Sequence, residues 1–118
     1  MVEPTTPEMN YITIDDLLKV ELVVGTIEQC EVVEKSDKLL KMQVNFGDKG
    51  MRQILAGIRH SYQPADLMGK QGVFVFNLKP RAMLGMESQG MMLVAEQADG
   101  KVSMTTVEKP VPNGSRLR

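Results

Sequence analysis

The stretch LLKMQVNFGDKGMRQILA, residues 39–56, decides the fold class of this chain. Over residues 39–46 apolar and polar side chains alternate, and this period of two indicates a β-strand with one buried face. The apolar members of the strand are Leu40, Met42, Val44 and Phe46. Residues 47–50, Gly-Asp-Lys-Gly, predict a hairpin turn into a second strand near 51–56.

Similar β patterns lie on both sides of this hairpin. Upstream, residues 22–33 indicate one long strand, which Gly25 allows to bend between two sheet layers. Downstream, the apolar runs at 73–76 and 91–95 are typical of buried strands. Each run is bounded by polar or glycine-containing segments, so we expect short strands joined by turns.

Two short helices and a terminal hairpin complete the expected elements. Thr13 is suited to cap a helix over 13–18, and the acidic residues that follow it suit the positive end of that helix. Residues 64–69 resemble a single helical turn. Residues 98–101, Ala-Asp-Gly-Lys, predict a turn into a last strand near 102–107, after which the tail should be extended.

This order of elements predicts an all-β fold. Five short strands with a helix between the third and the fourth fit a five-stranded OB-fold barrel with short helices and a C-terminal β extension. An SH3-like barrel is the main alternative on pattern alone. Residues 1–12 form a polar, proline-containing segment that we expect to be a linker or a disordered tail. Residues 13–118 are then one domain of ordinary size.

The charge of the chain is distributed unevenly. The formal net charge is −1, but residues 1–37 hold nine acidic and two basic residues. Residues 38–81 hold eight basic and two acidic residues. Such segregation can place positive charge on one face of a nearly neutral domain, as nucleic-acid binding requires. An ordinary mixed, solvated surface shows the same pattern.

The residue types needed for catalysis or metal binding are scarce. One histidine and one cysteine, His60 and Cys30, cannot supply a zinc site, and no nucleophile has an evident histidine partner. Gly85 and Gly90 are spaced as in a phosphate loop, but the Lys-Ser/Thr pair that such a loop needs is missing. We therefore expect no catalytic residue, metal or cofactor. A single cysteine, no secretory signal and no membrane-spanning run favour a cytoplasmic protein without membrane contact.

Methionine is abundant, and four of the ten methionines crowd one stretch: Met83, Met86, Met91 and Met92. Methionine fills irregular core space well, which is the simplest explanation. A core of this size has little room for all four. We therefore expect some of them at an interface with a partner or ligand.

Several segments together resemble a known family. They are Leu22-Val23-Val24-Gly25-Thr26-Ile27, Ser36-Asp37-Lys38-Leu39-Leu40, Ala56-Gly57-Ile58-Arg59 and, the most specific, the run from Asn77 to Met91, NLKPRAMLGMESQGM. From about Ile14 to its end the chain resembles the tRNA-binding domain at the C-terminus of many bacterial methionyl-tRNA synthetases. Free-standing dimeric tRNA-binding proteins, secretion-chaperone-like relatives and the phenylalanyl synthetase β-subunit carry similar domains.

The resemblance implies an OB fold, a homodimer and non-catalytic binding to the outer corner of tRNA, with little dependence on tRNA identity. By motif, it implies RNA contacts at Lys38, Arg59, Asn77, Lys79, Arg81, Ser88 and Met91. We expect an excised domain whose parent is a methionine–tRNA ligase. The alternatives are a free-standing tRNA-binding protein and a chaperone-like, protein-binding dimer. The last strand and the tail from Val102 should supply part of the dimer contact, because an added edge strand needs covering.

From the residues alone, each of these positions also has a structural explanation. Lys38 can pair with Asp37 at the surface, and the other cations can lie in solvated loops. Asn77 can cap the loop that follows its strand, and Ser88 can satisfy a turn. Met91 can belong to the core. Aromatic residues make up 4% of the chain and none lies in these motifs, which favours recognition of RNA shape and phosphates over base stacking.

Overall fold

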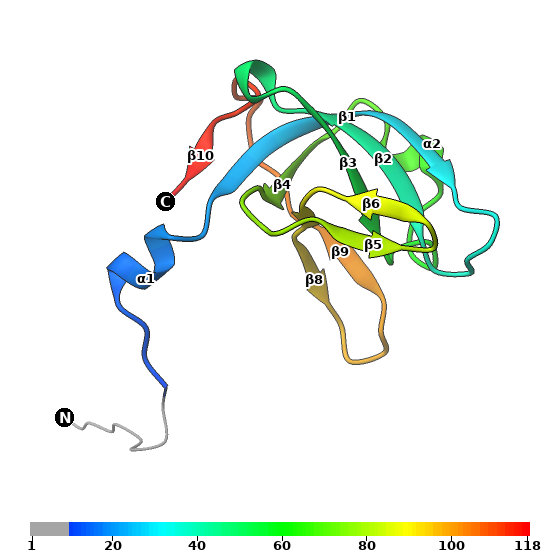
Figure 1. Ribbon diagram of the computed structural model, residues 1–118, viewed down its shortest axis with the longest axis horizontal. Helices are drawn as coiled ribbons and strands as arrows, with labels where there is room; N and C mark the ends of the chain where they lie inside the picture. Colours follow the sequence, from blue (N-terminus) through cyan, green and yellow to red (C-terminus); the bar gives the residue numbers. More distant parts are fainter. Residues whose placement is uncertain (1–9) are drawn as a thin grey trace.

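The computed structural model describes residues 10–118, and its fold is all-β with short helices (Figure 1). One antiparallel sheet holds five strands in the order β3-β2-β1-β4-β7, and β10 pairs with the start of β1 on the side opposite β4. The bounds of these strands are β1 Leu22–Val32, β2 Leu40–Asn45, β3 Met51–Ala56, β4 Gln71–Val75, β7 Met91–Met92 and β10 Arg116–Leu117.

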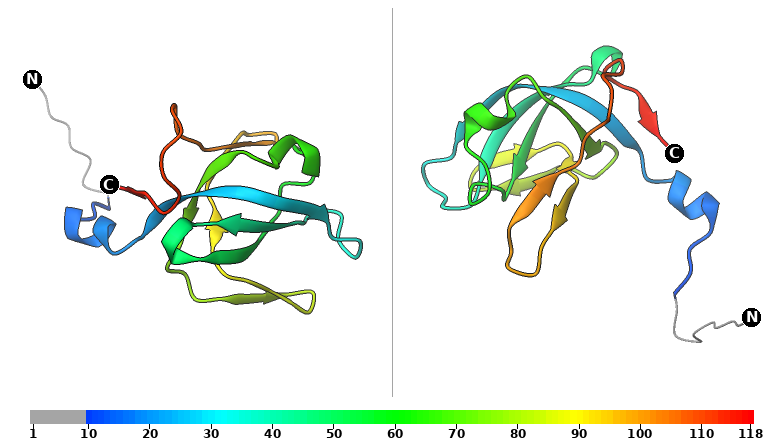
Figure 2. Two further views of the ribbon diagram at one scale, coloured as in Figure 1. Left: turned by 90° about the horizontal axis from the view of Figure 1, so that it is seen from above. Right: turned by 180° about the vertical axis from the view of Figure 1, so that it is seen from behind.

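The long strand β1 carries the curl of the sheet. Its first half, from Leu22 to Thr26, pairs with β4, while its second half, from Thr26 to Val32, pairs with β2. A Cβ atom added at Gly25 would lie 2.6 Å from Val44 Cγ1, so only glycine lets β1 approach the core this closely. In Figure 2 β1 is curved along its length, and it changes partners from β4 to β2 at Thr26, next to this glycine.

The sheet curls until β3 comes near the segment that precedes β7. Gln89 N donates to Gln53 O at 2.8 Å, and Leu55 N donates to Ser88 Oγ at 3.0 Å. These are individual hydrogen bonds and not a continuous ladder between β3 and β7. The observed sheet is therefore a curled half-barrel, which agrees with the expected all-β class.

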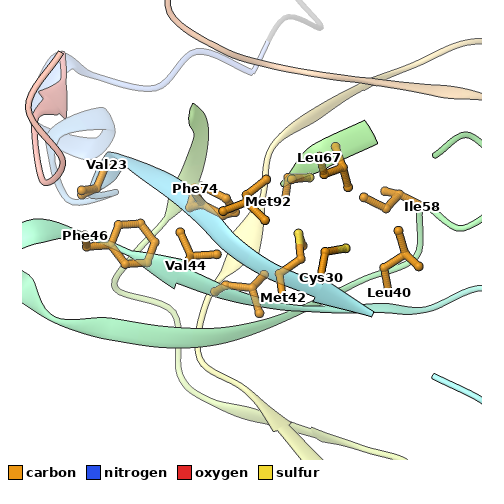
Figure 3. Close-up of a cluster of buried hydrophobic side chains, with 12 residues drawn as sticks. Val23, Cys30, Leu40, Met42, Val44, Phe46, Ile58, Leu67, Phe74 and Met92 are labelled. Atoms are coloured by element: carbon orange, nitrogen blue, oxygen red, sulfur yellow. The ribbon is translucent and has the colours of Figure 1, made fainter. Parts of the chain in front are cut away.

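The concave side of this sheet holds the hydrophobic core (Figure 3). The alternation of residues 40–46 is confirmed, because β2 buries every second side chain. Phe46 packs edge-to-face on Phe74, with ring centroids 5.4 Å apart. Two methionines of the described residues, Met42 and Met92, are buried there. Met83 and Met86 are only half-buried and Met91 is exposed, so the methionine-rich stretch does not lie wholly in the core.

The two predicted helices are present but short. Helix α1 (Ile14–Leu18) is capped by Thr13, whose Oγ1 accepts from Asp16 N at 3.0 Å. Helix α2 (Pro64–Leu67) covers one end of the core with Leu67. The turn after β2 is a 3-10 turn, η1 (Gly47–Lys49), that leads directly into β3.

Three segments differ from their sequence predictions. The predicted strand 91–95 is interrupted, so that β7 ends before β8 (Val94–Glu96), which pairs with β9 (Val102–Met104) instead. The tail, expected to be merely extended, ends in the short strand β10. The loop expected around Lys79 and Arg81 contains a hairpin, β5 (Arg81–Met83) and β6 (Met86–Ser88). In the predicted linker 1–12, residues 1–9 lie outside the described part, and residues 10–12 belong to no helix or strand.

Candidate nucleic-acid interface

Residues 77–88 form an arm that leaves the sheet after β4 and returns before β7. The arm begins with Asn77-Leu78-Lys79-Pro80 and continues into the β5–β6 hairpin, whose turn is Leu84-Gly85. Strand β6 packs beside β3, and Figure 1 shows the hairpin crossing in front of β3 and β2. The arm therefore brings the most specific sequence motif onto one outer face of the sheet.

Three of the predicted contact residues are exposed cations: Lys38, Lys79 and Arg81. Two ion pairs occur within residues 10–118, between Lys19 and Asp16 and between Lys41 and Glu31, and neither involves these three cations. The surface pair of Lys38 with Asp37 that the sequence allowed is not among them. Cations without an acidic partner are free to neutralise phosphates and to release the counterions of a nucleic acid.

Two shallow hollows lie along the arm. Lys79 lines the first together with Asn77 and Pro80. Arg81 lines the second, whose walls are mainly apolar and include Met91. Met91 is exposed, with 38% of its surface accessible, although its neighbour Met92 lies in the core. The structure thus brings Arg81 and Met91 together. Lys79 lies two residues before Arg81, on the other side of Pro80.

Two other predicted contacts are engaged within the protein. The Ser88 hydroxyl is 1% exposed; it accepts from Leu55 N at 3.0 Å and donates to Gly90 O at 2.9 Å. The Asn77 amide accepts from Glu21 N at 2.8 Å and donates to Lys19 O at 2.7 Å. Ser88 thus anchors the end of the arm to β3, and Asn77 joins the start of the arm to the beginning of β1.

Arg59 also holds neighbouring backbone in place. Its guanidinium donates to Ser36 O, and its backbone N donates to Lys38 O at 3.0 Å. Ser36 Oγ in turn accepts from Lys38 N at 3.0 Å. Arg59 and Ser36 therefore fix the turn between β1 and β2, which carries the exposed Lys38 side chain.

One important residue, Arg52, was counted in the sequence among the basic residues but given no role. Its guanidinium lies over the ring of Phe76, with Cζ 3.6 Å from the ring centroid. It donates to Phe76 O at 2.7 Å and to Gln89 O at 3.2 Å. The one available signal was a cation at a polar position of a predicted strand, which gives no indication of these long-range partners.

The described residues offer little for catalysis. Within residues 10–118 no three side chains of His, Cys, Asp or Glu gather where a metal ion could bind. Burial raises the pKa of the Cys30 thiol to about 11, and the neighbouring Glu31 carboxylate adds to this rise. The thiolate needed for nucleophilic attack is therefore nearly absent at neutral pH.

No helix in residues 10–118 is both long and apolar enough to cross a bilayer.

Comparison with known proteins identifies the family. The family described as "Putative tRNA binding domain" matches residues 22–116. The chain belongs to this tRNA-binding domain family. The match includes β1, the turn with Lys38 and the entire arm, so it covers all seven predicted contact residues. The family expected from the sequence motifs is thereby confirmed.

Among its relatives, the domain is 44% identical over 115 residues to the methionine–tRNA ligase of Caldanaerobacter subterraneus subsp. tengcongensis. That match covers 98% of this chain but 18% of the ligase. The methionine–tRNA ligase of Methanocaldococcus jannaschii is 44% identical over 94% of this chain and 17% of its own length. The chain thus spans less than a fifth of these ligases. It is a tRNA-binding module and not a catalytic domain.

Solved structures give the same fold for the tRNA-binding domain. A "MetRS related protein" from Pyrococcus horikoshii superposes with a TM-score of 0.88 at 39% identity, covering 93% of this chain and all of that chain. The "chaperone CsaA" of Bacillus anthracis str. Ames superposes with a TM-score of 0.87 at 28% identity, covering 92% and 100%. The domain therefore resembles short complete chains as well as pieces of long ligases.

Proposed function

We propose that this domain binds the outer corner of folded tRNA with little dependence on tRNA identity. The observation that carries the proposal is the grouping of Lys79 and Arg81 on one exposed arm, with Met91 of β7 beside Arg81 and Lys38 on a neighbouring turn. The cations would neutralise phosphates, and Met91 would pack against a ribose or a base edge.

The aromatic side chains support recognition of RNA shape. Phe46 and Phe74 are buried, and the ring of Phe76 is covered by Arg52. The two tyrosines are outside the arm: Tyr62 is half-buried, and Tyr11 is exposed in the segment before α1. Phosphate and shape recognition of a folded RNA therefore fits this surface better than stacking of a single strand.

In this proposal the remaining predicted contact residues act by holding the surface in place. Arg59 fixes the turn that carries Lys38, while Asn77 and Ser88 fix the two ends of the arm. We also propose that the curled sheet corresponds to a five-stranded OB barrel. The hydrogen bonds between Gln53 and Gln89 would take the place of the closing ladder.

We infer that the parent protein is a cytoplasmic methionine–tRNA ligase, in which this domain would raise affinity for tRNA. The similarity to two such ligases over nearly the whole domain supports this inference. The activity itself would reside outside these residues. A free-standing tRNA-binding protein is the alternative, and the full coverage of the Pyrococcus protein favours it. The open reading frame that contains residues 1–10 distinguishes the two.

We further propose that the domain forms a homodimer through residues 11–20. Helix α1 buries none of its side chains, and the apolar residues around it are between 40% and 76% exposed: Tyr11, Ile12, Ile14, Leu17, Leu18 and Val20. Arg116 from the tail donates to Leu18 O, so the tail lies against this segment. The sequence pointed to the tail and the strand from Val102 for this contact, and we add to it the exposed apolar side chains around α1.

Light scattering tests the dimer. The protein should show about twice the 13.1 kDa chain mass at micromolar concentration, and Leu17→Lys should reduce it to one chain mass. If the unsubstituted domain is monomeric at every concentration, the proposed dimer is contradicted. The same apolar segment would serve a chaperone-like function, in which peptide binding persists at high salt.

The experiment for tRNA binding is the double substitution Lys79→Ala with Arg81→Ala. Both side chains are exposed, so folding stability should hardly change. Affinity for tRNA should fall by about 1–3 kcal/mol, because two charge-assisted contacts are lost. The control Val75→Ala, at a buried position, should lower stability through a cavity and leave the binding of folded protein intact.

Two further measurements accompany this experiment. The parent should bind folded tRNA more tightly than an unstructured oligonucleotide of the same length, and its affinity should fall steeply with salt. Equal affinity for both RNAs contradicts shape recognition. If the double variant binds as the parent does, Lys38 and Arg59 are substituted next. Four silent substitutions would exclude this surface and favour the protein-binding function.

A further inference from the structure

The two ends of the arm meet at a single side chain. Arg52, on β3, donates to Phe76 O at 2.7 Å and to Gln89 O at 3.2 Å. Phe76 immediately follows β4 and Gln89 immediately follows β6, so these two carbonyls delimit residues 77–88. One guanidinium therefore binds the backbone just before the arm leaves the sheet and just after it returns.

The same guanidinium is fixed by stacking. Its Cζ lies 3.6 Å from the centroid of the Phe76 ring, close enough for a cation–π contact and for stacking of the planar group. The next residue of β3, Gln53, adds neutral hydrogen bonds to the returning end: its backbone N donates to Gln89 Oε1 at 2.9 Å, and its Nε2 donates to Glu87 O at 2.9 Å.

The arm has little stability of its own. Its hairpin has three residues in each strand, and a two-stranded hairpin in isolation is marginal in water. In addition, Leu84 in the turn has a φ of +50°, a conformation that costs free energy in any residue with a Cβ. The position of the arm on the sheet therefore depends on the contacts at its base.

We propose that Arg52 is a positioning residue for tRNA binding, which holds the arm so that Lys79 and Arg81 face the RNA together. This inference rests on the proposed function of the arm. Arg52 acts through the arm in this proposal, since its Nη1 binds both carbonyls and its guanidinium lies on the Phe76 ring. A phosphate contact through Nη2 or Nε is the competing role, and the salt dependence below distinguishes the two. Lysine should not replace it, since a compact ammonium group cannot lie flat on the Phe76 ring while it binds the same two carbonyls.

The test compares Arg52→Lys and Arg52→Gln with two references. Lys49→Gln is the matched control: Lys49 Nζ also lies over the Phe76 ring, 5.7 Å from its centroid, but Lys49 is exposed on η1 and outside the arm. Arg81→Gln is the reference for a lost phosphate contact. Affinity for tRNA is measured across a series of salt concentrations, at a temperature where circular dichroism shows each variant to be folded.

Both Arg52 variants should bind tRNA roughly five- to tenfold more weakly, as expected if the free arm occupies its binding position only about 10–20% of the time. The slope of log affinity against log salt should stay at the parent value, because the bound complex keeps its phosphate contacts. Arg81→Gln should instead reduce that slope by about one. Lys49→Gln should leave the affinity within about twofold of the parent.

Two readouts of the free protein report the arm directly. Trypsin should cut the Arg81–Ala82 bond several times faster in both Arg52 variants than in the parent or in Lys49→Gln, because cleavage follows the population of the released arm. Gln89→Ala removes one neutral bond at the same end, that from Gln53 N, and no charge. It should shift trypsin cleavage and tRNA affinity in the same direction, with the salt slope unchanged.

Several results would overturn the inference. Parent-like affinity of Arg52→Lys shows that charge is sufficient and removes the positioning role. A salt slope that falls by about one in Arg52→Gln, together with parent-like binding of Arg52→Lys, makes Arg52 a phosphate contact. If Arg52→Gln binds tRNA more weakly but trypsin does not cut at Arg81 faster, loss of Arg52 does not release the arm, and the inference is wrong. If the unsubstituted domain does not bind tRNA, the proposed function is refuted instead.

Discussion

Substitution of Ser88 distinguishes most sharply between a residue that contacts RNA and one that keeps the binding surface in position. Its side chain is 1% exposed and occupies the join between β6 and β3. The hydroxyl accepts from Leu55 N at 3.0 Å and donates to Gly90 O at 2.9 Å. The substitution Ser88→Ala removes one oxygen and leaves a methyl of nearly the same size, so its effect comes from these two hydrogen bonds.

The size of the effect follows from the two partners. Leu55 is itself buried, so its backbone N–H would lose its acceptor away from water, at a cost of about 1–3 kcal/mol. The bond to Gly90 O contributes about a further 1 kcal/mol. The free energy of unfolding should therefore fall by about 2–4 kcal/mol. For a domain of this length, that corresponds to a loss of roughly 10 °C in Tm.

Urea unfolding followed by circular dichroism measures this change, and Ser103→Ala is the matched control. Ser103 lies in β9 with an exposed side chain, so its substitution should alter stability by less than about 0.5 kcal/mol. Binding of tRNA is then measured at low temperature, where both variants are folded. The Ser88 variant should lose affinity only to the extent that the returning end of the arm is loosened.

A stable Ser88→Ala variant would refute this reasoning. If the urea midpoint stays at the parent value while tRNA affinity falls tenfold or more, the hydroxyl contacts RNA directly, and the buried geometry does not describe the bound state. If both stability and affinity stay at the parent values, the hydroxyl contributes to neither role.

Three further substitutions or treatments test the fold. Gly25→Ala should destabilise the domain by about 1–3 kcal/mol, because the new methyl would lie 2.6 Å from Val44 Cγ1 and 2.8 Å from Phe46 Cδ1; an unchanged urea midpoint contradicts this packing. Leu84→Asn should raise stability by about 1 kcal/mol in the same assay, since asparagine tolerates the φ of +50° in this turn, and a loss of stability would show that the leucine side chain packs usefully. Burial raises the pKa of Cys30 to about 11, so a thiol reagent at pH 8 should modify the native protein far more slowly than the urea-unfolded chain; equal rates would show that the thiol is accessible.

Much of the fold was predictable because its main signals are local. The alternation of residues 40–46 defines which side chains are buried in β2, whatever strands lie beside it. Gly25 lies next to the point where β1 changes partners, and Thr13 marks the start of α1. The arm was less predictable. Its hairpin has strands of three residues and a Leu84-Gly85 turn, which lacks the asparagine or aspartate that usually announces such a turn.

The candidate site divides in the same way. The sequence identified the motif from Asn77 to Met91 and, with it, the family and the exposed cations. It did not distinguish a free Lys79 from an engaged Asn77, because both are polar residues in the same motif. That distinction depends on Glu21 and Lys19, which lie more than fifty residues away along the chain.

The sequence by itself therefore determined the all-β class, the inward face of β2 and the tRNA-binding family. These follow from periodicity and motifs, which are patterns of residues close together in the sequence. Only the tertiary structure decided which polar side chains remain free to meet RNA and which hold the surface. Arg52 shows the reason: its three partners, the Phe76 ring, Phe76 O and Gln89 O, come together only when the sheet curls, and no spacing along the chain records that approach.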